Sequence, residues 1–141
     1  MAVVALVAVL SSCASSKKVG GTVPYVVADH YFFRNDAQIP ADARIATQEQ
    51  FDSLFGMAPV MGEGGLPTAI DFSRQFVIAV VKPETQYDTA LQPLLLKDDG
   101  RILTLGYKTK VGSKMSYSTQ PCMILVVDRK YDRGSVQLNG H

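Results

Sequence analysis

The chain has 141 residues, a length that favours one domain with a single core. Its 14 Lys and Arg nearly balance 13 Asp and Glu, so neither a basic nucleic-acid surface nor a polyacidic tail is expected. After the first ten residues, which are all apolar, no further apolar run approaches the roughly 18 residues that a membrane span needs.

Residues 1–12 predict a lipoprotein-type signal peptide. The run Met1–Leu10 is too short to cross a bilayer and is typical of a signal-peptide core. The next residues give Leu-Ser-Ser-Cys, the pattern of a bacterial lipobox, in which small residues admit the signal peptidase and the thiol of Cys13 carries the lipid. We therefore expect Cys13 to anchor the chain to a membrane of the bacterial cell envelope, with residues 13–22 as a flexible tether. The alternative is a buried N-terminal strand with an incidental cysteine.

Two apolar runs predict the centre of a β-sheet. Phe76–Val81 and Met123–Val127 are rich in Val, Ile and Leu without polar alternation, as expected of strands buried on both faces. Cys122 stands at the head of the second run, where a buried and inert cysteine is the common case. Around these runs, residues 23–141 predict one α+β, mostly β domain: a small antiparallel sheet, or a partly open barrel or sandwich, with one short helix packed on it.

Turn and cap residues predict the elements before the first central strand. Residues 23–34 are β-branched and aromatic and predict one or two strands. Thr47 predicts a helix N-cap, with Gln50 completing a capping box. Gly56 is expected to end this helix.

Between and after the central strands, the pattern predicts a hairpin. Asp98–Gly100 is its turn, and Pro93 indicates an edge or a bulge in the strand before it. Polar composition predicts irregular segments at Glu84–Asp88 and Val111–Gln120, and a charged turn at Asp128–Gly134 followed by a last short strand.

The longest irregular segment, Met57–Thr68, is the expected interaction loop. It contains three Gly, two Pro and two Met, and long loops in compact domains are either functional or mobile. Its apolar side chains would suit an adaptable protein contact, although a merely mobile loop is an equal alternative. The protein-binding residues that we expect in this loop and in the later polar one are Met61, Gly62, Glu63, Gly64, Gly65, Leu66 and Tyr117.

The sequence offers no pattern for catalysis or for a cofactor. With only two histidines, a His-rich zinc site is improbable. A Ser-His-Asp triad would have to use His30, but no nucleophile-elbow motif accompanies it, so His30 is expected to be a surface or strand residue. Asp98 and Asp99 lack the recurring acidic ligands of a calcium loop. We expect no enzyme, no metal and no cofactor.

The order of three motifs adds a family resemblance. Ile45–Leu54 (IATQEQFDSL), Asp71–Val80 (DFSRQFVIAV) and Thr119–Val127 (TQPCMILVV) resemble the C-terminal domain of the protease-complex subunit PrcB, found in bacterial lipoproteins. The similarity covers most of residues 44–138 and rests on hydrophobic, structural positions. The chain departs from the family pattern in its long Gly-rich loop and in Cys122, where an aromatic residue is common.

The resemblance implies a small domain that binds and stabilises a secreted protease without catalysis of its own. The first hypothesis is therefore a lipid-anchored module that binds another envelope or secreted protein, a protease being one candidate. The second is a protease inhibitor whose Gly-rich loop, residues 57–68, enters an active-site cleft. The third is a small-ligand carrier, which would require an apolar cavity.

Overall fold

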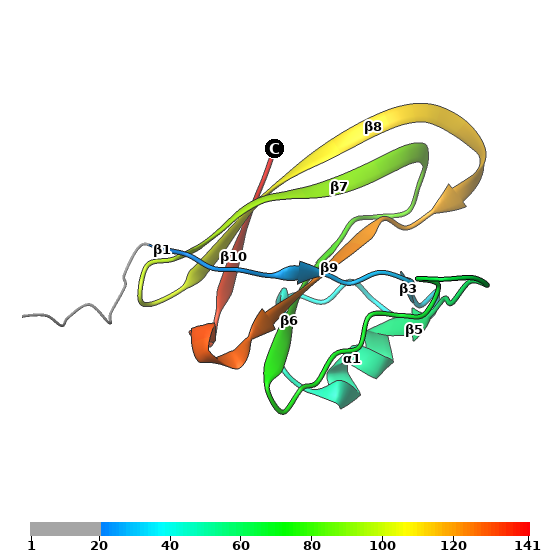
Figure 1. Ribbon diagram of the computed structural model, residues 1–141. Helices are drawn as coiled ribbons and strands as arrows, with labels where there is room; N and C mark the ends of the chain where they lie inside the picture. The colour runs from blue at the N-terminus through cyan, green and yellow to red at the C-terminus, as the bar shows by residue number, and fades with distance from the viewer. Residues whose placement is uncertain (1–20) are drawn as a thin grey trace, which may run out of the picture.

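The computed structural model describes residues 21–141, and in this part of the chain the fold is α+β and mostly β, as the sequence predicts (Figure 1). One short helix, α1 (Gln48–Leu54), accompanies the strands. The predicted signal peptide and Cys13 lie outside the described residues. The strands are β1 (Gly21–Thr22), β2 (Val26–Val27), β3 (Tyr31–Phe33), β4 (Arg44–Ile45), β5 (Phe55–Met57), β6 (Gln75–Val81), β7 (Thr85–Asp98), β8 (Leu103–Thr119), β9 (Cys122–Asp128) and β10 (Val136–Gly140).

The antiparallel pair β6–β9 forms the middle layer of the molecule. It belongs to a four-stranded sheet in the order β2-β9-β6-β4. Side chains along β6 alternate between two cores: Phe76, Ile78 and Val80 pack on one face, and Val77 and Ala79 on the other. The predicted burial on both faces is therefore confirmed.

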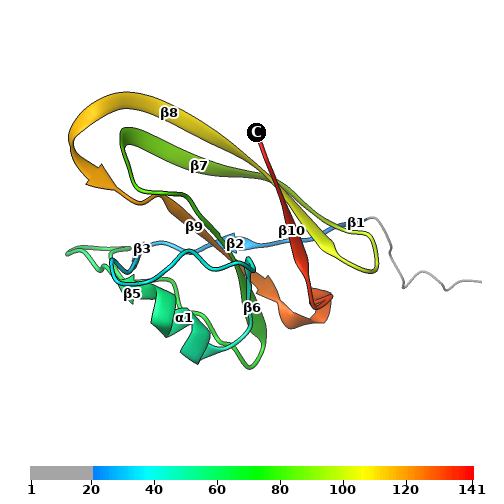
Figure 2. The same cartoon turned by 180° about the vertical axis from the view of Figure 1, so that it is seen from behind.

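A second sheet, in the order β1-β7-β8-β10, covers the first of these faces (Figure 2). Its long hairpin β7–β8 contributes Leu96, Leu103 and Leu105 to the core, each at most 1% exposed. The last strand, β10, runs parallel to β8, so the sheet is mixed rather than purely antiparallel.

Helix α1 and the small hairpin β3–β5 cover the opposite face of the middle sheet. Phe51 and Phe55 stack with ring centroids 5.0 Å apart and pack against Val77 and Ala79. The N-cap prediction is confirmed, because Thr47 Oγ1 accepts a hydrogen bond from the Gln50 amide at 3.1 Å.

The prediction that Gly56 ends the helix is wrong. The helix ends at Leu54, and Gly56 lies within β5, directly opposite Phe32 of β3. A Cβ at position 56 would lie 2.5 Å from Cζ of the Phe32 ring. Gly56 is thus explained by the aromatic ring that covers it from the neighbouring strand, rather than by a helix cap.

The two polar segments predicted as irregular are also corrected. β7 begins at Thr85, and β8 continues to Thr119, with Thr85 opposite Thr119. These outer halves of the hairpin are mostly exposed, so their side chains carry no buried alternation from which a strand could be recognised. The predicted bulge and turn are confirmed: the register shifts between Pro93 and Leu95, and Gly100 has φ 92°.

The charged turn after β9 connects the layers. Asp132 accepts hydrogen bonds from Arg44 Nε at 2.8 Å and Nη2 at 2.6 Å. Arg133 Nη2 lies 2.7 Å from Oδ2 of the buried Asp98, and Arg129 donates to the carbonyl oxygens of Phe72 and Ala46. Hydrogen bonds from the Arg44 guanidinium lower the pKa of Asp132, and those from Arg133 lower the pKa of Asp98.

Asp132→Asn is expected to lower the free energy of unfolding by about 1–2 kcal/mol at pH 7, because Arg44 loses its charge-assisted pair. The pKa of Asp132 is lower in the folded than in the unfolded state. The contribution of ionised Asp132 to the free energy of unfolding is therefore complete above about pH 4. It is lost as the pH falls through the pKa that Asp132 has in the folded state. Urea unfolding between pH 7 and pH 2 measures this pH dependence. As the pH falls, the free energy of unfolding should decrease more steeply for the wild type than for Asp132→Asn.

The matched control is Asp36→Asn, at an exposed position away from this turn. It should leave both the free energy and its pH dependence close to wild type. Equal curves for wild type and Asp132→Asn would show that the bidentate pair does not stabilise the fold.

Candidate protein-binding surface

The long loop after β5 is tied back to the segment between β2 and β3. The Ala58 amide donates to the His30 carbonyl oxygen at 2.8 Å, and the Thr68 amide donates to the Asp29 carbonyl oxygen at 3.2 Å. The Tyr31 hydroxyl donates to the Thr68 carbonyl oxygen at 2.6 Å. Both ends of the loop are therefore hydrogen-bonded to the same short stretch of chain.

His30 holds the middle of the loop. Its Nε2 lies 2.7 Å from the Gly64 carbonyl oxygen, so the tautomer with Nε2–H donates this bond. His30 has φ 67°, a left-handed backbone that non-glycine residues rarely adopt. The expectation that His30 is a surface or strand residue missed this contact, which joins residues 34 positions apart.

The glycines of the loop have separate structural reasons. Gly62 and Gly64 have φ values of 103° and 74°, which favour glycine. Gly65 is buried, and a Cβ there would lie 2.0 Å from the Val60 carbonyl oxygen. The Val60 amide in turn donates to the Gly65 carbonyl oxygen at 2.9 Å. These contacts explain the glycines by backbone geometry, and the use of the loop for protein binding stays a prediction.

This loop presents apolar side chains to solvent. Met61 is 99% exposed and Leu66 is 78% exposed. Val60 and Met57 are also more than half exposed. Three of these exposed side chains belong to the loop and Met57 ends β5. Exposed apolar side chains that gather in one patch are typical of interaction sites.

Tyr117 lies on β8, not in a loop, and its side chain is 59% exposed. The end of β8 and the Gly-rich loop lie at the same end of the molecule, opposite β1 (Figure 1). Beside the end of β8 lies a pocket of about 610 Å³, whose wall includes the three residues of β3 and Ser118–Gln120. Neither Tyr117 nor any residue of the Gly-rich loop lines this pocket, so the pocket does not join the two sets of predicted residues.

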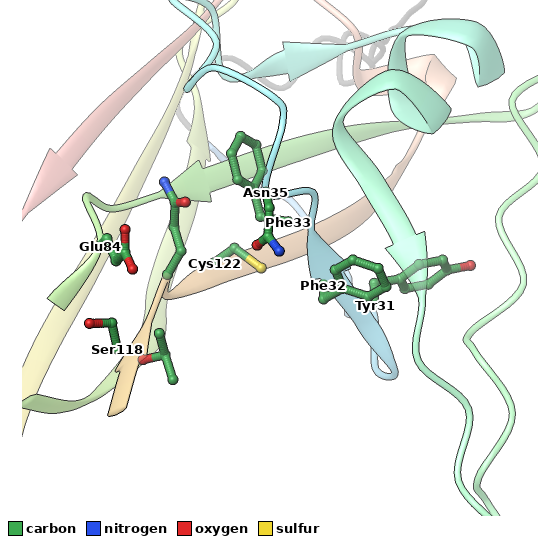
Figure 3. Close-up of a pocket in the computed structure, with 9 residues that line it drawn as sticks. Tyr31, Phe32, Phe33, Asn35, Glu84, Ser118 and Cys122 are labelled. Carbon is green, nitrogen blue, oxygen red and sulfur yellow. The ribbon is translucent and has the colours of Figure 1, made fainter. Parts of the chain in front are cut away.

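The pocket is mostly polar and is formed by segments far apart in the sequence (Figure 3). Glu84 and Ser118 line one side, and Phe33 and Asn35 the other, with the Cys122 side chain between them. The Tyr31 hydroxyl points away from these groups. Sequence reasoning missed this pocket, because no local pattern signals that these residues meet.

Cys122 is half-buried in the wall of this pocket and has a free thiol. Burial raises the pKa of this thiol, against a smaller lowering effect of the Phe33 backbone. An activated nucleophile needs the opposite shift and a neighbouring base, and no imidazole lines the pocket. This environment agrees with an unreactive, structural cysteine.

A second, more apolar pocket of about 390 Å³ lies between α1 and the end of the Gly-rich loop. Leu66 and Ile70 line one side, and Phe51 and Asp52 of the helix line the other. Burial, followed by the charge of Asp52, raises the pKa of Tyr31 in this pocket. A pocket of this size next to exposed apolar side chains can accept one side chain of a partner protein.

Within residues 21–141, no three His, Cys, Asp or Glu side chains are grouped so that they could hold a metal ion. The same residues contain no helix that is both long and apolar enough for a membrane span. No family model matches the chain, and no curated protein or solved structure is similar enough to count as a match.

His30→Ala should loosen the Gly-rich loop without unfolding the domain, because one hydrogen bond to Gly64 is lost. Such a bond contributes about 0.5–1.5 kcal/mol, so a glutamate-specific protease should cleave after Glu63 roughly 2–10 times faster. Mass spectrometry of the fragments separates this cleavage from others, and the melting temperature should change little.

His141→Ala is the matched control, since it removes the other histidine at a position remote from the loop. Its cleavage rate after Glu63 should equal that of the wild type. An unchanged rate in His30→Ala would mean that His30 does not hold the loop.

Proposed function

We propose that this chain is a non-catalytic, lipid-anchored binding module of the bacterial cell envelope. Its partner would be another envelope or secreted protein, bound through the Gly-rich loop, residues 57–68. The observation that carries the proposal is the display of Met61 and Leu66 on a loop that hydrogen bonds to residues 29–31 hold in place. A pre-ordered apolar loop loses little conformational entropy on binding, which favours affinity.

The position of the N-terminal strand supports this arrangement. Gly21 of β1 pairs with Asp98, beside the turn of the long hairpin. Thr85 and Thr119, at the other end of that hairpin, lie near the polar pocket. The strand β7, with 14 residues, spans about 40 Å between these two ends. An anchor at Cys13 would therefore be attached to the end of the domain that lies opposite the Gly-rich loop.

The resemblance to the PrcB C-terminal domain suggests which class of protein the partner belongs to. A secreted protease that the module stabilises is the partner we favour. The raised pKa of the Cys122 thiol and the use of His30 in a structural contact support a module without catalysis of its own.

A protease inhibitor is the second candidate, favoured by one observation. Inhibitory loops must resist cleavage, and the backbone of residues 58–68 is hydrogen-bonded at both ends and in its middle. Activity assays on captured proteases distinguish the candidates. Full activity in the complex supports a stabilising subunit, and loss of activity supports an inhibitor.

The test is a pull-down with residues 14–141, from envelope and secreted fractions of the host, read by mass spectrometry. Met61→Asp combined with Leu66→Asp places two charges on the exposed loop and should reduce recovery of the partner at least about tenfold. Leu94→Asp is the control, because Leu94 is 48% exposed on β7, away from the loop. Equal recovery by the loop variant would contradict the proposed surface, and a blank with the wild type would contradict the function.

A further inference from the structure

The strand β10 forms one free edge of the second sheet. Among residues 21–141 it pairs only with β8, in parallel, from Val136 opposite Leu103 to Gly140 opposite Tyr107. The His141 amide donates to the Tyr107 carbonyl oxygen, and the His141 carbonyl oxygen accepts from the Thr109 amide. Backbone groups of successive residues in a strand point to opposite sides. Because those of His141 bond to β8, the N–H and C=O groups of Val136, Leu138 and Gly140 point to the other side, toward the free edge of the sheet.

The other described edges carry features that prevent edge-to-edge pairing. The strands β1, β2 and β4 have two residues each, and β3 and β5 have three. The open part of β7 contains Asp88, Pro93 and register shifts, and the open part of β8 contains Lys110 and Lys114. Short length, charge, proline and bulges are the usual protections of an edge.

β10 has none of these protections. It has five residues, its register with β8 is regular, and residues 134–140 (GSVQLNG) include no charge and no proline. Leu138 lies opposite Leu105 on the core side of the sheet and is nevertheless 37% exposed. An exposed apolar side chain beside an unprotected edge leaves room for a further strand on that edge.

We propose that a second copy of this chain pairs with β10, strand to strand and antiparallel, across a twofold axis at Leu138. The direction of the free backbone groups is compatible with this symmetry, because those of Leu138 point to the open edge. Leu138 would exchange both backbone hydrogen bonds with Leu138 of the second copy, and Val136 would face Gly140. In a twofold contact, residues near the axis lie close to their own equivalents in the second copy. Charged residues would repel each other there, and this edge carries none. The two four-stranded sheets would become one sheet of eight strands.

The contact is small, with five residues from each copy, so the dimer is expected to be weak and concentration-dependent. Sedimentation equilibrium of residues 14–141 between about 10 µM and 1 mM measures it, a range suited to interfaces at the low end of the size scale. A wild type that stays monomeric to the upper concentration overturns the proposal.

Leu138→Lys and Leu138→Glu test the register. Each variant alone places like charges on the axis and should weaken the dimer at least about tenfold, whereas a mixture pairs Lys with Glu and should restore association. The restored association also shows that both variants are folded. Tyr87→Lys is the control, at a similarly exposed position of β7 that lies opposite Lys114, beyond the residues of β8 that pair with β10, and should dimerise like the wild type.

Three results would contradict the assignment. The first is a dimer that the Leu138 variants leave unchanged. The second is a mixture that fails to associate. The third is a monomeric wild type that captures a strand of a different protein through β10, shown by loss of that capture in Leu138→Lys. The strand lies on a different part of the molecule from the Gly-rich loop, so this test and the pull-down can fail independently.

Discussion

The fold depends on a pair of strands, β6 and β9, that leave no face to water. Each of the five residues Phe76–Val80 is at most 3% exposed, and Met123–Val127 are at most 5% exposed. Strands with this composition require a cover on both sides. The long hairpin β7–β8 covers one side, and α1 with the hairpin β3–β5 covers the other. The remaining elements connect these covers, and the charged turn after β9 joins the layers through Arg44 and Asp98.

The same constraint explains where the candidate binding surface lies. The hairpin β3–β5 reaches the middle sheet with Phe33 and Phe55, whose rings are 5.6 Å apart. The chain must then travel from the end of β5 to the start of β6, and the Gly-rich loop makes this connection. Hydrogen bonds to residues 29–31 keep the loop beside β3. The apolar side chains of Met61 and Leu66 belong to neither core and are exposed to solvent.

Sequence patterns were sufficient for the elements whose burial is local. The continuous apolar runs predicted β6 and β9, Thr47 predicted the helix start, and Pro93 predicted a bulge. They failed where a residue's role comes from a distant neighbour. In the sequence, Gly56 has the pattern of a helix C-terminus. In the structure, it is explained by the Phe32 ring, which leaves no room for a Cβ at this position. The outer halves of β7 and β8 resemble loops, because an exposed ribbon has no buried face to give a period of two.

For the candidate site, the sequence predicted exposure better than it predicted contacts. Apolar residues on either side of the glycines led to the prediction of an interaction loop, and Met61 and Leu66 are its most exposed large side chains. Tyr117 was expected in a loop but lies on β8. The contact of His30 with Gly64 and the pocket around Cys122 could not be predicted, since both join segments that only the tertiary fold brings together.

The claim on which the functional account depends is that the Gly-rich loop is ordered in the free protein. Backbone ¹⁵N relaxation of residues 14–141 measures this directly on the picosecond-to-nanosecond timescale. The account predicts order parameters for Gly64 and Gly65 close to about 0.85, the level of a rigid backbone, as for β6 and β9. Values below about 0.6 at these glycines would show a flexible loop and contradict the account.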